Sequence, residues 1–435
     1  MKVGISTSVI QRGLSGVAQH TLALTRAFLS LEPRHEFTLF VLKEDLPLFD
    51  FARDRMELVA VPERHRPPVN NILWHQLALP RLARQRRLDV LHVPSYRRML
   101  ATRPCALVAT IHDLAPFRLA KKYDWKRMFY GKVVARRLAR RQHELIVVSE
   151  STGRDVEKFF GIPKNRLHVI LNGLDHSRFF PGCRDEAKGF IARTRGISQP
   201  FFLYIARLEH PGKNHARLIE AFNQFKAATG SDWRLVLGGS DWHGADVIHD
   251  CARKSPYASD ITCLGFVPDR EIATWYRGAD IFIYPSLFEG FGMPPLEAMA
   301  CACPVICPTS GALGEVVGDA VANVNPEDVE SLRTQMARLA GSMVERERLI
   351  TRGLRRAPRF DWESAAVATL AVYQKAVIRA RSAGSAGLVP GELPRLPTRP
   401  APLCPDSAPS DGKACWSHPP RSRVIPAKTL GSSTP

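Results

Sequence analysis

The sequence predicts an α/β protein with two Rossmann-like domains. Short apolar, β-branched runs alternate with amphipathic helical segments from the first residues, which is typical of parallel sheets covered by helices. The alternation starts a second time near residue 199, after a polar, glycine-containing stretch at residues 180–199 that suits a linker between domains. The chain of 435 residues is also too long for one typical domain.

Each strand and helix of the first half is predicted from its local sequence pattern. Runs rich in Val, Ile, Leu and Phe predict buried strands, and apolar residues at helical spacing predict helices. Ser151 is expected to cap the helix that follows it. The expected order is strand 2–7, helix 12–30, strands 36–42 and 56–61, helix 71–85, strands 89–95 and 106–114, helix 125–142, strand 145–150, helix 152–161 and strand 167–173.

The second half repeats this logic and ends in a long helix. The expected order is strand 199–208, helix 214–229, strands 233–239 and 260–266, helix 269–279, strand 280–285, a loop and helix at 286–302, strand 303–308, helix 311–317, strand 320–324 and helix 360–380. The predicted boundaries are a first domain at 1–185, a second at 186–359, a helix at 360–380 that returns to the first domain, and a tail at 381–435. The tail is rich in Pro, Ser and Gly without periodicity, so it is expected to be disordered and dispensable.

Composition narrows the class of partner. Lys and Arg number 61 against 42 Asp and Glu, a formal net charge of +19, which favours anionic partners such as nucleotides or anionic lipids. Nucleic acid is not expected, because no helix-turn-helix, zinc-finger or RNA-binding signature is present. The sequence contains no run of 18 apolar residues, so no membrane-spanning helix is predicted. The cysteines are scattered without zinc spacing, so no metal site is expected.

One segment leaves two interpretations open. Residues 125–141 interleave aromatic and aliphatic residues with Lys and Arg, as on an amphipathic basic helix. The pattern fits an ordinary surface helix with a solvated arginine face. It fits equally well a helix that touches an anionic membrane.

Four loops at predicted strand ends carry the residues of greatest chemical interest. Parallel strands bring these ends to one edge of each sheet, where ligands bind in such folds. The loops are QRGLSGVAQH with Gly13 and Gly16, TIHDLAP with His112, ARLEHPGKNH with Arg207 and Lys213, and FEGFGMPPLEA with Glu289 and Glu297. The last loop joins a buried strand to a helix that starts at a Pro-Pro pair, an arrangement that is expected to bind anions and polar ligands.

These motifs together resemble the retaining glycosyltransferases of the GT-B fold, family 4, a group that includes bacterial mannosyltransferases of surface-polysaccharide assembly. The resemblance covers about residues 1–380. Its most specific parts are ARLEHPGKNH, the stretch from GFVPDREIATWYRGADIFIYPS through FEGFGMPPLEAMACACPVI, and GEVVGDA. Glu289 and Glu297, with seven residues between them, match the E-x7-E motif of the family.

The resemblance implies roles for individual residues. Arg207 and Lys213 match the basic pair that holds the diphosphate, Glu289 the acid on donor-sugar hydroxyls, and Glu297 the acid on the ribose. His112 matches the histidine beside the reacting sugar. The expected catalytic set is therefore His112, Arg207, Lys213 and Glu289, and the expected donor-binding set is Gly13, Gly16, Gly265, Phe266, Gly290, Phe291, Gly292 and Glu297.

The resemblance implies a cytoplasmic enzyme, peripheral on the inner face of the cell membrane if the basic helix touches lipid. It would move a hexose, with mannose from GDP-mannose as the first expectation, onto a lipid-linked or surface glycan. No D-x-D stretch occurs, so the basic pair is expected to replace a metal, and no cofactor besides the nucleotide-sugar substrate is expected. The alternatives share the fold: a sugar-nucleotide epimerase or phosphorylase, and a catalytically dead protein that binds a nucleotide sugar or another anion.

Overall fold

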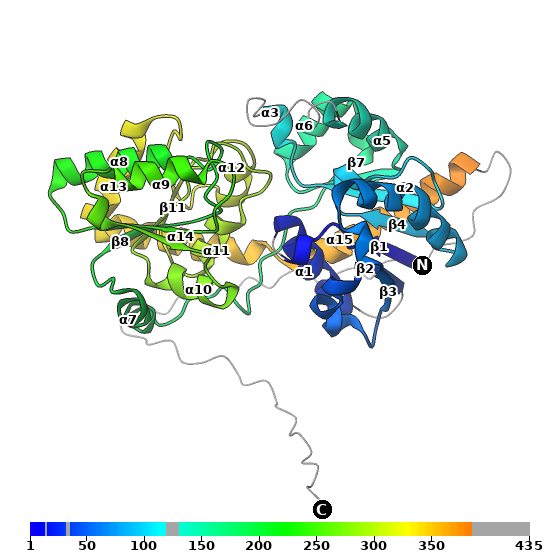
Figure 1. The fold of residues 1–435 in the computed structure, drawn as a ribbon, viewed down its shortest axis with the longest axis horizontal. Coiled ribbons are helices and arrows are strands. Elements are labelled where there is room, and N and C mark those ends of the chain that lie inside the picture. Colours follow the sequence, from blue (N-terminus) through cyan, green and yellow to red (C-terminus); the bar gives the residue numbers. More distant parts are fainter. Residues whose placement is uncertain (14, 32–34, 119–129, 385–435) are drawn as a thin grey trace, which may run out of the picture. The chain divides into compact units, whose positions relative to one another are not determined.

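The computed structural model describes residues 1–13, 15–31, 35–118 and 130–384. The predicted disordered tail lies outside these residues, except for its first few positions. Two parallel sheets, each covered by helices, form two Rossmann-like domains (Figure 1). The fold class predicted from the alternating pattern is therefore confirmed.

The first domain, blue to cyan in Figure 1, contains a seven-stranded sheet in the order β3-β2-β1-β4-β5-β6-β7. Its core is formed by strands that are buried on both faces, as expected for parallel sheets. The strands are β1 (Lys2–Ser6), β2 (Glu36–Leu42), β3 (Glu57–Val61), β4 (Val90–Val93), β5 (Ala106–Ile111), β6 (Glu144–Val147) and β7 (Leu167–Val169). The helices are α1 (Gly16–Ser30), α2 (Pro68–Gln85), α3 (Ala115–Arg118), α5 (Arg136–Arg141) and α6 (Glu150–Phe160).

The second domain, green to yellow, contains a six-stranded sheet in the order β10-β9-β8-β11-β12-β13. The strands are β8 (Phe201–Ile205), β9 (Arg234–Gly238), β10 (Ile261–Gly265), β11 (Ile281–Ile283), β12 (Val305–Cys307) and β13 (Ala322–Asn323). The helices are α7 (Arg184–Arg195), α8 (His215–Thr229), α9 (Ala245–Arg253), α10 (Asp269–Gly278), α11 (Met293–Ala300), α12 (Gly311–Val317), α13 (Val329–Gly341) and α14 (Met343–Arg356). The chain joins the core of this domain early, since Leu174 and Phe179 already pack in its hydrophobic cluster.

The final helix α15 (Trp362–Gly384) returns to the first domain, as predicted. Leu370 and Tyr373 are buried in the hydrophobic cluster of the first sheet, and Trp362 packs at its edge. The Tyr373 hydroxyl lies 2.7 Å from Nδ1 of His92 on β4, so a polar contact fixes the helix as well. Burial of the large Tyr373 side chain together with this hydrogen bond fixes the position of the helix on the sheet.

Two local details differ from the sequence-based expectation. Ser149, not Ser151, caps α6, because its hydroxyl accepts the N–H of Thr152 at 3.0 Å. The helix expected at 125–142 is described only from residue 130 on. There it consists of a π-helical segment, η6 (Tyr130–Ala135), which runs into α5.

Candidate functional site

The strand order places two of the predicted loops side by side. β8 and β11 are neighbours in the second sheet, although β9 and β10 separate them in sequence. The order of the sheet reverses direction at this point, and the crevice at such a reversal is where ligands bind in parallel sheets. The loop after β8 carries Arg207 and Lys213, and the loop after β11 carries Glu289.

Lys213 and Glu289 form a largely buried ion pair between these two loops. The Lys213 ammonium donates to Oε1 of Glu289 at 2.6 Å, and the Tyr284 hydroxyl donates to the same oxygen at 2.7 Å. The Lys213 side chain is 18% exposed and that of Glu289 is 15% exposed. A further contact fixes the backbone of the basic loop, since the Tyr204 hydroxyl donates to the carbonyl of Lys213 at 2.7 Å. Both charged groups are thus held in place before any ligand arrives.

Each member of the pair keeps the other charged. Burial by itself lowers the pKa of Lys213, but the Glu289 carboxylate outweighs burial, and the pKa is raised. Burial likewise favours a higher pKa for Glu289, but the Lys213 charge and the hydrogen bonds to the carboxylate outweigh it, and the pKa is lowered. At neutral pH the site therefore holds a cation and an anion within hydrogen-bond distance of each other.

The glycine loop between β11 and α11 brings its backbone close to β5. A Cβ atom at Gly290 would lie 1.9 Å from the carbonyl oxygen of His112, so only glycine fits there. Gly292 has a φ of 112°, in the left-handed region. The amides of Gly290, Phe291 and Gly292 find no acceptor among the described residues. These three N–H groups are therefore free to donate to a ligand.

The start of α11 supplies fewer donors than the sequence suggested. A helix N-terminus usually offers several unpaired N–H groups to an anion. Here Pro294 and Pro295 occupy the first turn and have no N–H. The polar character of this loop therefore comes from the amides that precede the helix rather than from the helix end.

Arg207 lies in a more open environment than Lys213. Its side chain is 49% exposed, and its nearest carboxylate oxygen is on Glu209 at 3.7 Å. The guanidinium carbon also lies 4.9 Å from the centre of the Trp242 ring, which is itself exposed. A guanidinium over an aromatic face is held by a cation–π contact and keeps its outer N–H groups available.

Glu297 projects from the second turn of α11 and has no cationic partner within salt-bridge distance among the described residues. One carboxylate oxygen accepts the Tyr276 hydroxyl at 2.9 Å. Burial raises the pKa of Glu297 to about 7, against the opposing effect of Tyr276 and of the more distant Arg178. The two glutamates of the motif thus differ in charge state: Glu289 is ionised throughout the neutral range, and Glu297 titrates within it.

This difference predicts a pH effect on stability. A carboxyl group with a raised pKa keeps its proton in the folded state where the unfolded state has released it, so its contribution falls as pH rises from about 4.5 to about 7. The buried histidines, with lowered pKa values, act in the opposite sense below about 6.5. Glu297→Gln should therefore raise Tm by a few degrees at pH 8 and much less at pH 5. Thermal unfolding of both proteins across this range measures the difference, and an equal Tm change at both pH values would contradict a raised pKa.

His112 follows β5 and is held as a neutral ring. Its Nε2 lies 3.2 Å from the Pro94 carbonyl, which can only accept, so Nε2 carries the proton. Burial lowers the pKa of His112 to about 4. Nδ1 is then an acceptor for a ligand hydroxyl. The ring packs edge-on against His20 of α1, whose Nδ1 lies 2.9 Å from Oδ1 of Asn172.

The remaining predicted residues lie at strand ends without joining the Lys213–Glu289 pair. Gly13 ends a helical turn after β1 with a φ of 82°, and Gly16 is the first residue of α1. Gly265 ends β10 with a φ of 69°, and Phe266 beside it is 60% exposed. Among the described residues, no hydrogen bond or ion pair links these four to Lys213 or Glu289.

Three contacts at the site were not predicted from the sequence. Tyr284 and Tyr276 orient the two glutamates, but Tyr284 follows an apolar strand and Tyr276 lies on the amphipathic helix α10, so the pattern indicated only burial. Glu315 of α12 accepts the N–H groups of Glu150 and Ser151 at 2.6 and 2.7 Å, so it binds the first turn of α6. Its motif, GEVVGDA, was recognised, but nothing in the sequence indicated this partner.

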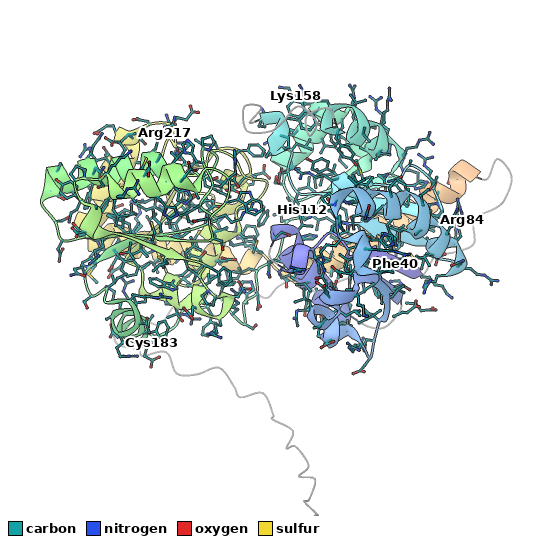
Figure 2. All side chains as sticks on the ribbon, in the orientation of Figure 1. Phe40, Arg84, His112, Lys158, Cys183 and Arg217 are labelled. Atoms are coloured by element: carbon teal, nitrogen blue, oxygen red, sulfur yellow. The ribbon has the colours of Figure 1, made fainter. Side chains whose placement is uncertain are left out.

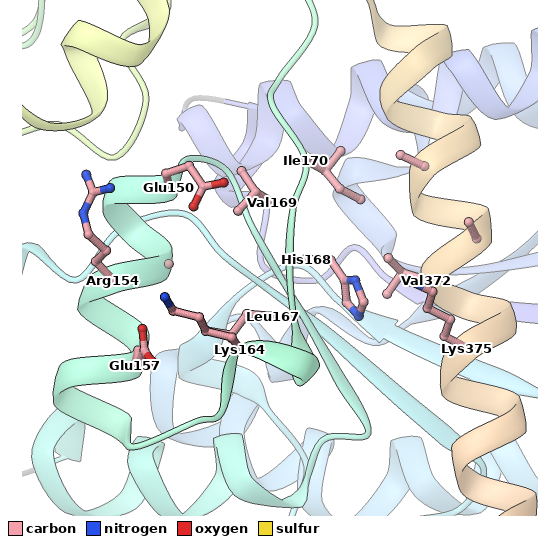
Figure 3. Close-up of a pocket in the computed structure, with 13 residues that line it drawn as sticks. Glu150, Arg154, Glu157, Lys164, Leu167, His168, Val169, Ile170, Val372 and Lys375 are labelled. Atoms are coloured by element: carbon pink, nitrogen blue, oxygen red, sulfur yellow. The ribbon is translucent and has the colours of Figure 1, made fainter.

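The cavity shown in Figure 3 lies elsewhere. It has a volume of about 630 Å³ and is lined by residues of α6, β7 and α15, among them Arg154, His168 and Lys375. None of the predicted site residues lines it. The chemistry of the strand-end loops, rather than the size of a cavity, therefore identifies the candidate site.

Comparison with known families matches both halves of the chain. Residues 14–178 match the model described as Glycosyltransferase Family 4, and residues 192–356 match the model described as Glycosyl transferases group 1. The second match contains Arg207, Lys213 and both glutamates of the motif.

Individual relatives extend over most of the described chain. An O-antigen chain mannosyltransferase B of Escherichia coli is 26% identical over 86% of this chain and 100% of its own length. An MMP alpha-(1->4)-mannosyltransferase of Mycolicibacterium hassiacum is 32% identical over 63% of this chain and 66% of its own. A structure from Anabaena in complex with UDP-glucose superposes with a TM-score of 0.65 at 17% identity, covering 88% of this chain and 100% of that one. The chain therefore belongs to the GT-B glycosyltransferases of the family 4 type, with the two Rossmann-like domains that define their fold.

Proposed function

We propose that this glycosyltransferase retains the anomeric configuration and transfers mannose from GDP-mannose to a lipid-linked or surface glycan on the cytoplasmic side of the membrane. The observation that carries the proposal is the Lys213–Glu289 ion pair, which joins the loops at the reversal point of the second sheet. Two relatives that are called mannosyltransferases by name support mannose as the sugar. The first of them also acts, by its name, on the O-antigen chain, which supports a glycan acceptor.

The residues at the strand ends provide the functions that such a transfer needs. As the bond to the leaving diphosphate breaks, negative charge grows on the phosphate oxygens. Arg207 and Lys213 supply fixed positive charge, and the amides of Gly290, Phe291 and Gly292 supply neutral donors beside it. In this proposal the diphosphate contacts Lys213 on the side opposite Glu289, so that the ammonium bridges phosphate and carboxylate.

The sugar and the ribose would contact different carboxylates. Glu289 is ionised and rigidly held, so it can accept hydrogen bonds from sugar hydroxyls. Glu297, eight residues later, would meet the ribose. His112 would present Nδ1 as an acceptor to a sugar hydroxyl, because its other nitrogen is committed to Pro94. Gly13 and Gly16 would let the first loop approach the diphosphate, and Gly265 and Phe266 would lie beside the base.

Metal independence is part of the proposal and has its own test. Two fixed cations can neutralise a leaving diphosphate without a bound Mg²⁺. We expect the rate of transfer to change less than about twofold when Mg²⁺ is added or when a chelator removes divalent ions. A strict requirement for a divalent metal would contradict the assignment of Arg207 and Lys213 to this task.

The proposed activity is tested by turnover with defined donors. Purified full-length protein is incubated with GDP-mannose, GDP-glucose, UDP-glucose or UDP-galactose and with lipid-linked glycan acceptors, and release of the nucleoside diphosphate is measured. GDP release with mannosylated product of retained configuration supports the proposal. Donor binding without release of nucleotide would indicate a dead member of the fold. Interconversion of sugar nucleotides without any acceptor would indicate an epimerase.

A further inference from the structure

Helix α2 exposes a row of apolar side chains on its outer face. Val69 is 68% exposed, Leu73 is 52% exposed and Leu77 is 57% exposed. Their spacing of four residues places them in one line along the helix. Single exposed apolar residues are normal on a protein surface, but a continuous row is typical of an interaction site.

The row is not needed to hold the helix on its own domain. The opposite side of α2 already buries Trp74, Leu79 and Ala83 in a hydrophobic cluster with Phe40 of β2. Figure 2 labels Phe40 in this domain and Arg84 on α2. The inner face therefore accounts for the packing of α2, and the outer apolar face has no partner among the described residues.

The same face continues into positive charge. Arg81 and Arg84 follow Leu77 at helical spacing and are exposed. Among the described residues neither forms an ion pair. Residues 64–88 contain no Asp or Glu at all. We define the α2 face as Val69, Leu73, Leu77, Arg81 and Arg84.

A second group of cations is connected to α2 through one short element. The helical turn η4 (Tyr96–Arg98) contacts both α2 and η6, and the Tyr130 hydroxyl donates to the Arg97 carbonyl at 2.8 Å. The next helix, α5, exposes Arg136, Arg137 and Arg140. Its apolar side chain Leu138 packs inward instead, as does Tyr130 of η6.

This arrangement changes how the basic segment at 125–141 is interpreted. Residues 125–129 lie outside the described part of the chain. In the part from 130 on, the apolar side faces the core, so this part can attract a charged surface but has little to insert into one. The apolar row that can insert lies on α2.

We propose that the α2 face docks on an anionic lipid bilayer, with Val69, Leu73 and Leu77 in the interfacial layer and the arginines of α2 and α5 at the headgroups. A bilayer offers an apolar layer and negative charge together, which is the combination that this surface complements. A second copy of the chain would instead bring the same arginines together. The chain's own residues 385–435 carry more Lys and Arg than Asp and Glu, and so would also be repelled.

The proposal is tested by sedimentation of the full-length protein with vesicles of phosphatidylcholine, alone or mixed with phosphatidylglycerol. Leu73→Gln with Leu77→Gln should weaken binding to the anionic vesicles by roughly tenfold or more, because two inserting side chains become polar. Arg81→Glu with Arg84→Glu should weaken it by a similar factor, and more strongly at low salt. Arg136→Glu with Arg137→Glu should reduce binding through charge alone.

A matched control is available on the second domain. Met343 and Val344 at the start of α14 are 66% and 73% exposed. Met343→Gln with Val344→Gln also makes two exposed apolar side chains polar, at somewhat higher exposure than Leu73 and Leu77, and it should leave vesicle binding unchanged. All the variants alter exposed side chains, so each should keep the Tm of the parent protein, which confirms that binding rather than folding is compared.

Two results would overturn the proposal. One is equal binding of the parent and of Leu73→Gln with Leu77→Gln, which would show that α2 does not insert. The other is a parent that forms dimers and ignores vesicles while this variant is monomeric, which would make the α2 face an interface between copies. Membrane docking is related to the proposed function because the proposed acceptor is lipid-linked. Vesicle binding is measured without donor or acceptor, so either proposal can fail while the other stands.

Discussion

Lys213→Ala should lower kcat by roughly 10²–10³ and also lower Tm by about 10 °C. The loss of rate follows from the removal of a fixed charge beside the leaving diphosphate. The loss of stability follows from the burial of its partner, because Glu289 would lose the ammonium 2.6 Å away that offsets the cost of burying its charge. Removing one member of a buried pair typically costs about 3–5 kcal/mol.

Arg207 provides the matched comparison. Its side chain is half exposed, and its ion pair with Glu209, at 3.7 Å, is longer than the 2.6 Å pair of Lys213 with Glu289. Arg207→Ala should therefore lower kcat by the same order, roughly 10²–10³, while Tm stays within a degree or two of the parent. The resemblance seen in the sequence assigned both cations to the same basic pair. The structure separates them through burial.

A double substitution separates the two effects of Lys213. Lys213→Ala combined with Glu289→Gln removes both charges and leaves a neutral amide that Tyr284 can still contact. This protein should recover most of the lost stability and none of the lost activity. The measurements are thermal unfolding and steady-state kinetics on the parent protein, Lys213→Ala, Arg207→Ala and the double variant. If the double variant were as unstable as Lys213→Ala, the pair would not be the source of the instability. If Lys213→Ala kept full kcat, the diphosphate would bind elsewhere.

The sequence predicted that Lys213 and Glu289 lie on loops at one edge of a sheet, because the physical signal is local. Glycines, basic residues and acids directly after short β-branched runs indicate polar groups at the ends of buried strands. Parallel strands carry such ends to one edge. Lys213 and Glu289 meet for this reason, although 76 positions separate them in sequence. The return of α15 was predictable in the same way, from an amphipathic pattern after the last strand.

The partners that tune these residues could not be predicted, because they depend on packing between distant segments. Tyr284 directly follows an apolar strand, so its place in the sequence indicates only burial. Only the structure shows that its hydroxyl donates to Glu289. Glu315 binds the first turn of α6 across 165 positions of sequence. The exposed row on α2 has the composition of a core-facing row, so periodicity identifies the helix without showing that it has apolar residues on both sides.

The two glutamates of the motif should have separable kinetic effects. Glu289→Gln should mainly lower kcat, by roughly 10²–10³, whereas Glu297→Gln should mainly raise the KM for donor, by roughly 10- to 100-fold. The basis is that the reacting carbon flattens and gains positive charge in the transition state, so contacts to the sugar tighten there. Contacts to the ribose stay the same from bound donor to transition state. Interactions that strengthen only in the transition state raise kcat, and uniform interactions lower KM.

The structure supports this division through the charge state of each acid. Glu289 is held ionised by Lys213, so it can stabilise positive charge that develops nearby. Glu297 has a pKa of about 7, so it has lost its proton only in part at neutral pH and is suited to hydrogen bonding with hydroxyls rather than to charge stabilisation. The KM for donor in the parent protein should accordingly fall as pH rises from 6 to 8, and this dependence should disappear in Glu297→Gln.

The measurement is steady-state kinetics of both variants against varied donor, with Tm as the check on folding. Glutamine keeps the size of each side chain and its hydrogen bond to Tyr284 or Tyr276. If Glu297→Gln lost kcat at saturating donor while Glu289→Gln lost only affinity, the two roles would be exchanged, with the sugar at α11 and the ribose at the loop. If neither constant changed in either variant, the edge between β8 and β11 would not be the active site. The reaction would then have to be sought elsewhere, because Arg207, Lys213 and Glu289 lie on loops at one edge of one sheet and Glu297 lies on the helix that follows.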